Sequence, residues 1–186
     1  ELMIGKDTAA YETPFTVSVD LLGNGCTTGI SASDRSKTIK ALADPNINKN
    51  QFGKPGHIFP LKARKGGVLR RAGHTEAAVD LAKLAKLNPV GVIVEILNED
   101  GSMARTPELF KILEKFKLKF ITIKDLIAYR IKNESLIKEE VEVELPTEFG
   151  DFKMKAFQQT TNNQIHLAIH KGEWKENENV LVRVHS

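Results

Sequence analysis

The order of apolar and polar positions predicts a strand and then a helix near the start of the chain. In Phe15–Asp20, Phe, Val and Val alternate with Thr, Ser and Asp, which is the period of a half-buried strand. We expect Cys26–Ile30 to return as a second strand. Ser31 or Ser33 then provides a natural N-cap for a helix that runs to Ala43 and stops before Asp44-Pro45.

The middle of the chain predicts further helices and strands. Thr75 can cap a second helix, and Thr106-Pro-Glu is a strong start for a third. A short helix is expected over residues 124–131. Val90–Leu97 is almost entirely apolar, as expected of a central strand covered on both faces, and Leu118–Ile123 is another strand-like run.

Strands that alternate with helices predict an α/β (mixed α+β) fold, with a layered sheet flanked by helices over residues 1–132. The Gly- and Pro-rich region 46–72 is predicted to be an ordered loop with a short strand near His57–Leu61. The charged stretch 133–140 is predicted to be a linker. After it, residues 141–186 contain short alternating runs typical of antiparallel strands: Val141–Leu145, Phe152–Gln158, Gln164–Ile169 and Val180–Val184. This tail is too short for a full domain, so we expect it to be the truncated start of one.

Composition indicates the broad class of protein, but it does not indicate an activity. The 186 residues are 41% hydrophobic and 27% charged, with a net charge of +3, which is too small to argue for nucleic-acid binding by itself. One cysteine, Cys26, excludes an intrachain disulfide and fits a reducing compartment. There is no apolar run of membrane-spanning length, so we expect a cytoplasmic protein with no membrane partner.

Basic residues and glycines gather just before the second predicted helix. Residues 54–86 carry eight Lys or Arg against Glu76 and Asp80, which suits an anionic ligand, although a solvated face explains it as well. Two helix starts, at residues 27–33 and 73–75, offer free backbone N–H groups to a phosphate. The hydroxyls of Thr28, Ser31 and Thr75 and the guanidinium of Arg71 would strengthen such a site. Ordinary N-caps remain an equal interpretation.

Three other side chains carry candidate chemistry. We expect His74, at the mouth of a helix beside Arg71, to be neutral and therefore able to bind a metal or a hydrogen-bond partner, although a histidine taken alone in such a place is more often structural. Glu95 interrupts an apolar strand, where a carboxylate is costly unless it is paired or functional; alternatively, it reaches solvent or Arg105. His57 is either a turn residue or a general acid/base, and its spacing does not decide between them.

Several runs, in order and spacing, resemble 3,4-dihydroxy-2-butanone 4-phosphate synthase, an enzyme of riboflavin biosynthesis. The runs are Phe15–Asp20, Thr27–Arg35, Pro55–Leu61, Gly66–Leu69, Arg71–Glu76 and Glu99–Arg105. The resemblance implies a Mg²⁺- (or Mn²⁺-) dependent lyase that converts D-ribulose 5-phosphate into L-3,4-dihydroxy-2-butanone 4-phosphate and formate. It also implies a homodimer with active sites at the interface.

The same resemblance assigns roles to residues of this chain. It implies that Arg71, Ala72, Gly73, His74 and Thr75 bind substrate, with His74 also a metal ligand. It implies that Glu95 binds substrate and, like His57, is needed for activity. Thr28 and Ser31 would form the phosphate-side wall.

The tail resembles the beginning of GTP cyclohydrolase II, at Leu145–Gly150 and Val180–Ser186, which implies a bifunctional fusion. The synthase family's acidic segment, which supplies another metal ligand, has no match in Glu1–Tyr11, and the cyclohydrolase's three zinc cysteines are not in these residues. If the protein begins at Glu1, we expect impaired lyase activity.

Two alternatives to the lyase remain. GTP cyclohydrolase activity is supported by the tail and weakened by the missing zinc ligands. A non-catalytic phosphate- or nucleic-acid-binding module would explain residues 54–86 but not Glu95 together with His74; we therefore expect no nucleic-acid partner.

Overall fold

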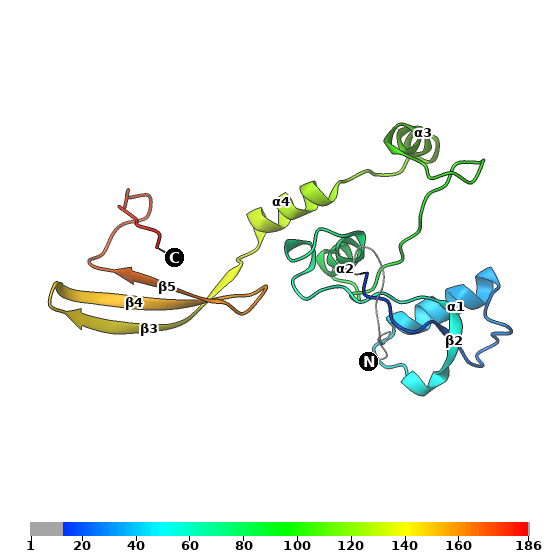
Figure 1. Ribbon diagram of the computed structural model, residues 1–186, viewed down its shortest axis with the longest axis horizontal. Helices are drawn as coiled ribbons and strands as arrows, with labels where there is room; N and C mark the ends of the chain where they lie inside the picture. The colour runs from blue at the N-terminus through cyan, green and yellow to red at the C-terminus, as the bar shows by residue number, and fades with distance from the viewer. Residues whose placement is uncertain (1–12, 186) are drawn as a thin grey trace. The chain divides into compact units, whose positions relative to one another are not determined.

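The computed structural model describes residues 13–185, and the chain divides into two compact units, one reaching to Lys132 and one beginning at Asn133. The first unit contains strands β1 and β2 and the helices, and the second contains strands β3, β4 and β5 (Figure 1). Helices together with antiparallel strands confirm the predicted mixed α/β class.

A two-stranded antiparallel sheet and one helix form the start of the first unit. Strand β1 (Val19–Leu21) pairs with β2 (Phe52–Ile58), and helix α1 (Ala32–Ala43) lies against β1. The Leu21 N–H donates to the buried Thr38 hydroxyl of α1, with N and Oγ1 3.0 Å apart. This bond fixes the helix on the strand, so the loop before α1 is held next to the sheet.

Strand β2 carries an irregularity that becomes part of the candidate site. Val19 faces Ile58 but Asp20 faces Gly53, so residues 54–57 bulge out of the ladder. Side-chain oxygens of β1 and its approach accept the amides of this bulge: Ser18 Oγ from Gly56 N–H at 3.1 Å, and Asp20 Oδ1 from His57 N–H at 2.9 Å. A side chain on Gly56 would place Cβ 2.1 Å from the Val19 backbone, so this close approach requires glycine.

Helix α2 (His74–Leu84) follows a single 3-10 turn (Gly67–Leu69) and is tied to it and to helix α4 (Ile123–Asn133). The buried Asp80 carboxylate of α2 accepts the Val68 N–H at 2.7 Å and an Arg130 N–H at 2.7 Å. Arg130 also donates to the Gly66 carbonyl at 3.0 Å. One charged cluster therefore joins two helices and the glycine turn.

The second unit is an antiparallel meander in the order β3-β4-β5. Its strands are β3 (Ile137–Thr147), β4 (Gly150–Gln159) and β5 (Ile165–His170). Lys155 of β4 lies between Glu139 and Glu142 of β3, with Nζ–O distances of 3.3 and 2.8 Å. Strand β3 begins at Ile137, inside the stretch predicted to be a linker, because its charged residues pair across the sheet.

The predicted helices form, with small shifts at their starts. Of the two predicted N-caps of α1, Ser31 is the one observed, and the helix ends at Ala43 with Asp44 as its C-cap, where the prediction stopped it. Helix α2 is capped by Gly73 rather than by Thr75, which lies buried in the first turn. Helix α3 (Thr106–Phe116) begins at the predicted start, but its N-cap is Arg105, so Thr106 is the first helical residue and not the cap. Among the described residues, no helix is both long and apolar enough to cross a bilayer.

Several predicted strands were wrong. Cys26–Ile30 and Val180–Val184 form no strand, and Val90–Leu97 and Leu118–Ile123 run outside any ladder apart from one bridge between Leu97 and Met103. The side chains of the apolar run are exposed, with Val94 84% exposed. A strand exists only through hydrogen bonds to a neighbour, and within residues 13–185 no strand lies beside these runs. These runs have a high β propensity, but propensity alone does not provide the neighbouring strand that a ladder needs.

Candidate functional site

A cavity of about 430 Å³ in the first unit brings together two of the motifs singled out in the sequence. His57, at the end of the β2 bulge, and the buried Thr75 of α2 both line it. Arg35 and Ile39 of α1 and the backbone region 89–93 complete much of the wall. The cavity is mostly apolar with a few polar groups, which is typical of a small-molecule site.

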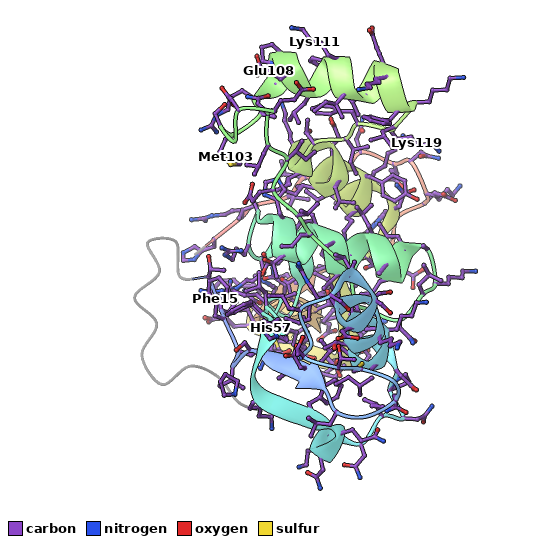
Figure 2. All side chains as sticks on the ribbon, turned by 90° about the vertical axis from the view of Figure 1, so that its right-hand side faces the viewer. Phe15, His57, Met103, Glu108, Lys111 and Lys119 are labelled. Atoms are coloured by element: carbon purple, nitrogen blue, oxygen red, sulfur yellow. The ribbon has the colours of Figure 1, made fainter. Side chains whose placement is uncertain are left out.

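His57 is held from one side by Asp20. The ring Nδ1 lies 2.6 Å from Asp20 Oδ2, while the His57 backbone N–H binds Oδ1 of the same carboxylate. The Asp20 side chain is 15% exposed and the His57 side chain 42% exposed. Figure 2 labels His57 on the ribbon of strand β2. His57 is thus an oriented imidazole at a cavity wall, rather than a freely rotating turn residue.

The loop before α1 is folded around the Asp34 carboxylate. Asp34 Oδ2 accepts the Thr27 N–H, the Thr27 hydroxyl and the Gly29 N–H at 3.1, 2.8 and 3.1 Å, and the Asp34 N–H donates to Ser31 Oγ. The Thr27 hydroxyl, aided by these backbone donors, lowers the pKa of Asp34 against the opposing effect of burial.

This loop favours the N-cap interpretation for Ser31, because its hydroxyl already accepts an intrahelical amide. Two backbone donors that the sequence offered to a phosphate are likewise bound to Asp34. Thr28 is exposed and, in the described part of the chain, makes no hydrogen bond. Its hydroxyl remains a candidate for substrate binding.

Arg71 is positioned by a fully buried carboxylate. Arg71 Nη1 lies 2.8 Å from Glu76 Oε2, and the Arg64 N–H donates to Glu76 Oε1 at 2.9 Å. Burial raises the pKa of Glu76, but the hydrogen bonds from Arg64 and Arg71 outweigh it, so the pKa lies below its usual value. A Cβ on Gly73 would come within 2.2 Å of Arg71 Nη1, so this residue leaves room for the guanidinium.

The other residues of this motif lie at the start of α2. Ala72 and His74 are exposed, Gly73 is half-buried, and Thr75 is buried against the cavity. Across residues 13–185, no three His, Cys, Asp or Glu side chains group closely enough to hold a metal ion. His74 can offer one nitrogen ligand, but the described side chains alone do not fit Mg²⁺, which takes oxygen ligands.

Glu95 is not brought to the cavity wall. It lies in the exposed run after α2, and among the described residues it forms neither a hydrogen bond nor an ion pair, with Arg105 or any other residue. The prediction of a buried Glu95 in a strand was therefore wrong, whereas the alternative that it reaches solvent agrees with the structure. The start of the run approaches α2, where Gly91 lies against Ala78, but within residues 13–185 no strand pairs with the run and Glu95 stays exposed.

Sequence reasoning missed three carboxylates that organise the site: Asp20, Asp34 and Glu76. Each lies inside a run that was quoted for its neighbours. The available signal was local for Asp34 and Glu76, since each follows a Gly/Ser/Thr-rich helix start at a spacing where a carboxylate can bind loop amides. Asp20 gave no such signal, because its partner His57 is distant in sequence.

Comparisons with known proteins agree with the resemblance found in the residues. A family model described as 3,4-dihydroxy-2-butanone 4-phosphate synthase matches residues 1–129, and one described as GTP cyclohydrolase II matches residues 138–186. The chain is 64% identical over 186 residues to the riboflavin biosynthesis protein RibBA of Cytophaga hutchinsonii. It is 57% identical to that of Porphyromonas gingivalis and 52% identical to that of Bacillus cytotoxicus. All of this chain aligns with each relative but only 46% of the relative's length, so it spans about half of them.

Solved structures give the same picture. RibBX of A. baumannii, a two-domain 3,4-dihydroxy-2-butanone 4-phosphate synthase, matches with a TM-score of 0.75 and 44% identity, over 93% of this chain and 51% of that one. A 3,4-dihydroxy-2-butanone 4-phosphate synthase in complex with two magnesium ions matches with a TM-score of 0.64 and 38% identity, over 71% of this chain and 66% of that one.

Proposed function

The chain belongs to the 3,4-dihydroxy-2-butanone 4-phosphate synthase family, and we propose that the protein carrying it makes that compound in riboflavin biosynthesis. The reaction converts D-ribulose 5-phosphate into L-3,4-dihydroxy-2-butanone 4-phosphate and formate. The observation that carries the proposal is the cavity that His57 and Thr75 line together. It brings an oriented imidazole to the motif that contains Arg71 and His74.

The residues take complementary parts in this proposal. Arg71, held by Glu76, would bind an oxyanion of the substrate with Ala72, Gly73 and Thr75. His57 would transfer protons as a general acid/base. The part that the resemblance gives to Glu95, in substrate binding and catalysis, requires its exposed run to bring the carboxylate to the cavity that His57 lines. Thr28 and Ser31 would border the phosphate, and for Ser31 this requires sharing its oxygen with the Asp34 amide.

A divalent ion, Mg²⁺ or Mn²⁺, is part of the proposal, with His74 as one ligand. The relative in complex with two magnesium ions supports the use of such an ion. When bound, the ion would polarise substrate oxygens. Because no three His, Cys, Asp or Glu side chains group together within residues 13–185, the ligand set around His74 would be completed from outside these residues. We also propose the homodimer implied by the resemblance, which light scattering coupled to gel filtration would test.

The test is formate release from D-ribulose 5-phosphate by the full-length protein, with and without added Mg²⁺. We expect release that a chelator abolishes, and an His57→Gln variant that loses it on the order of 100-fold or more. Lys83→Ala, on the exposed side of α2, is the control and should act like the wild type. If the wild-type protein releases no formate, the proposal fails.

GTP cyclohydrolase II activity is the second candidate, and one observation favours it: the family match to residues 138–186. We propose a domain boundary close to residue 132, with this second activity belonging to the protein as a whole. The test is the consumption of GTP by the full-length protein in an assay without D-ribulose 5-phosphate. This assay distinguishes the cyclohydrolase activity from the synthase activity.

A further inference from the structure

The Asp20 carboxylate contacts His57 through both of its oxygens. Oδ1 accepts the backbone N–H at 2.9 Å, and Oδ2 lies 2.6 Å from ring Nδ1. An ionised carboxylate is an acceptor only, so Nδ1 must carry the proton in this contact. The other ring nitrogen, Nε2, is then left with its lone pair when the imidazole is neutral.

The surroundings of Asp20 leave its side chain little freedom. Gly29, at a φ of +89°, packs so closely that a Cβ there would lie 2.2 Å from Asp20 Oδ2. The Gly29 N–H is in turn bound to Asp34. The loop that contains Thr28 and Gly29 therefore packs against one side of the carboxylate, while His57 binds its other side.

The bulge of β2 explains why this carboxylate is needed. The His57 amide lies outside the regular ladder, and Asp20 Oδ1 takes the place of a strand carbonyl. Because Oδ1 is committed to the backbone, only Oδ2 faces the ring. The orientation of the carboxylate, and hence the tautomer of the ring, is fixed by the same bulge that places His57 at the cavity wall.

We propose that Asp20 is the positioning residue for His57: it holds the imidazole in the Nδ1–H tautomer, with Nε2 available as the proton acceptor at the cavity. This inference rests on the proposed function for the role of His57 in the reaction. Asp20 itself need not touch substrate.

The geometry predicts an inverted tautomer in Asp20→Asn. The asparagine oxygen can still accept the His57 N–H, which forces the amide NH₂ toward ring Nδ1. A donor in that position requires Nδ1 to accept, so the neutral ring must carry its proton on Nε2. The substitution thus keeps the bulge and changes the neutral imidazole from the Nδ1–H to the Nε2–H tautomer.

Ser18→Ala is the matched control. It removes the side-chain acceptor for the neighbouring Gly56 N–H at 3.1 Å, in the same bulge, but Ser18 makes no hydrogen bond to the ring. Any general loosening of the bulge would appear in this variant as well. A change confined to Asp20→Asn would identify the contact with the ring as the cause.

The experiment is ¹⁵N NMR of the full-length protein with labelled histidine, recorded above the ordinary titration range of imidazole, where ring shifts report the tautomer. His57→Gln identifies the resonances. We expect Nδ1–H in the wild type and in Ser18→Ala, and Nε2–H in Asp20→Asn. A wild-type ring in the Nε2–H form, or an unchanged ring in Asp20→Asn, would overturn the proposal.

Formate release from the same three proteins tests the consequence. We expect Asp20→Asn to lower kcat on the order of 100-fold with a much smaller change in KM, and Ser18→Ala to stay within about threefold of the wild type. An inverted ring with unchanged kcat would overturn the positioning role. If the wild type releases no formate while its ring is in the Nδ1–H form, the proposed function fails and the contact itself stands.

Discussion

At the scale of single residues, three carboxylates are buried beside the apolar core side chains. Glu76 is 0% exposed, and Asp34 and Asp80 are each 3% exposed. Each accepts at least one backbone N–H from a loop as well as a side-chain donor. Loops that cannot form ladders satisfy their amides in this way. The ordering of these loops therefore depends on the negative charge of the carboxylates that bind their amides.

Glu76→Gln tests this dependence through stability. Glu76 is ionised in the folded state with a pKa below its ordinary 4.5, because hydrogen bonds from Arg64 and Arg71 outweigh burial. Its stabilising effect is fully present above the ordinary value and is lost as pH falls through the lower, folded-state value. We expect Glu76→Gln to reduce the free energy of unfolding by about 2 kcal/mol near neutral pH.

Urea unfolding of both proteins between about pH 7 and pH 3 measures this effect. The wild type should lose stability below about pH 5, and the difference between the two proteins should shrink there. Parallel curves for the two proteins would contradict the assignment of the charge to Glu76.

Gly73→Ala separates the position of Arg71 from the stability of the helix. The new Cβ would approach Arg71 Nη1 to 2.2 Å and Glu76 Oε2 to 2.6 Å, while the backbone conformation of Gly73 suits alanine. Since flexible side-chain ends can move, we expect a cost of only about 1 kcal/mol. KM for D-ribulose 5-phosphate should rise about tenfold, measured by formate release. An unchanged KM would exclude Arg71 from substrate binding.

At the scale of elements, the Asp80–Arg130 pair joins helices α2 and α4 of the first unit. Arg130 is the charged partner that α4 supplies to a carboxylate buried in α2. We expect Arg130→Met to lower the free energy of unfolding by about 2–3 kcal/mol, because Asp80 keeps its burial and loses a charged donor. Lys132→Met, at an exposed position of the same helix, should change it by less than about 0.5 kcal/mol. Equal effects in urea unfolding would contradict this role.

What the sequence could predict depended on how local each signal was. Ser31 and Asp44 set the bounds of α1 because a cap acts on amides within one turn. Val90–Leu97 carries a strong strand pattern, yet its structure depends on partners that periodicity cannot supply. The Asp20–His57 contact joins residues separated by 37 positions across a bulge, and no spacing rule predicts that pairing. Helix bounds were therefore predictable, whereas strand pairing and the site geometry required the structure.

The unpaired runs give a prediction for hydrogen exchange in the 186-residue chain. Amides of residues 90–96 lie outside any ladder, whereas those of β4 are paired with strands on both sides. We expect the former to exchange within seconds and the latter at least about 100-fold more slowly. Comparable protection in mass-spectrometric exchange would show that Val90–Leu97 has found a partner.

At the scale of the whole molecule, the two units differ in what holds them together. Every buried side chain of the described chain lies in the first unit, whereas residues 133–185 contain none in that class. The second unit has a regular sheet with ion pairs, but the apolar side chains of β4 are only half-buried, and many on β3 and β5 are exposed, such as Val141 at 51% and Leu167 at 60%. Exposed ion pairs contribute little, so hydrogen bonds and the partial burial of β4 have to oppose the entropy of ordering the strands.

Separating the units tests this difference. We expect residues 133–186, expressed alone, to lack cooperative unfolding in urea and to give poorly dispersed amide resonances, because a three-stranded sheet with no fully buried side chain is only marginally stable in water. Residues 1–132 should keep the unfolding midpoint of the first transition of the 186-residue chain, since their buried residues come from their own sequence. A cooperative transition in residues 133–186 would contradict this expectation, as would the loss of the first transition in residues 1–132.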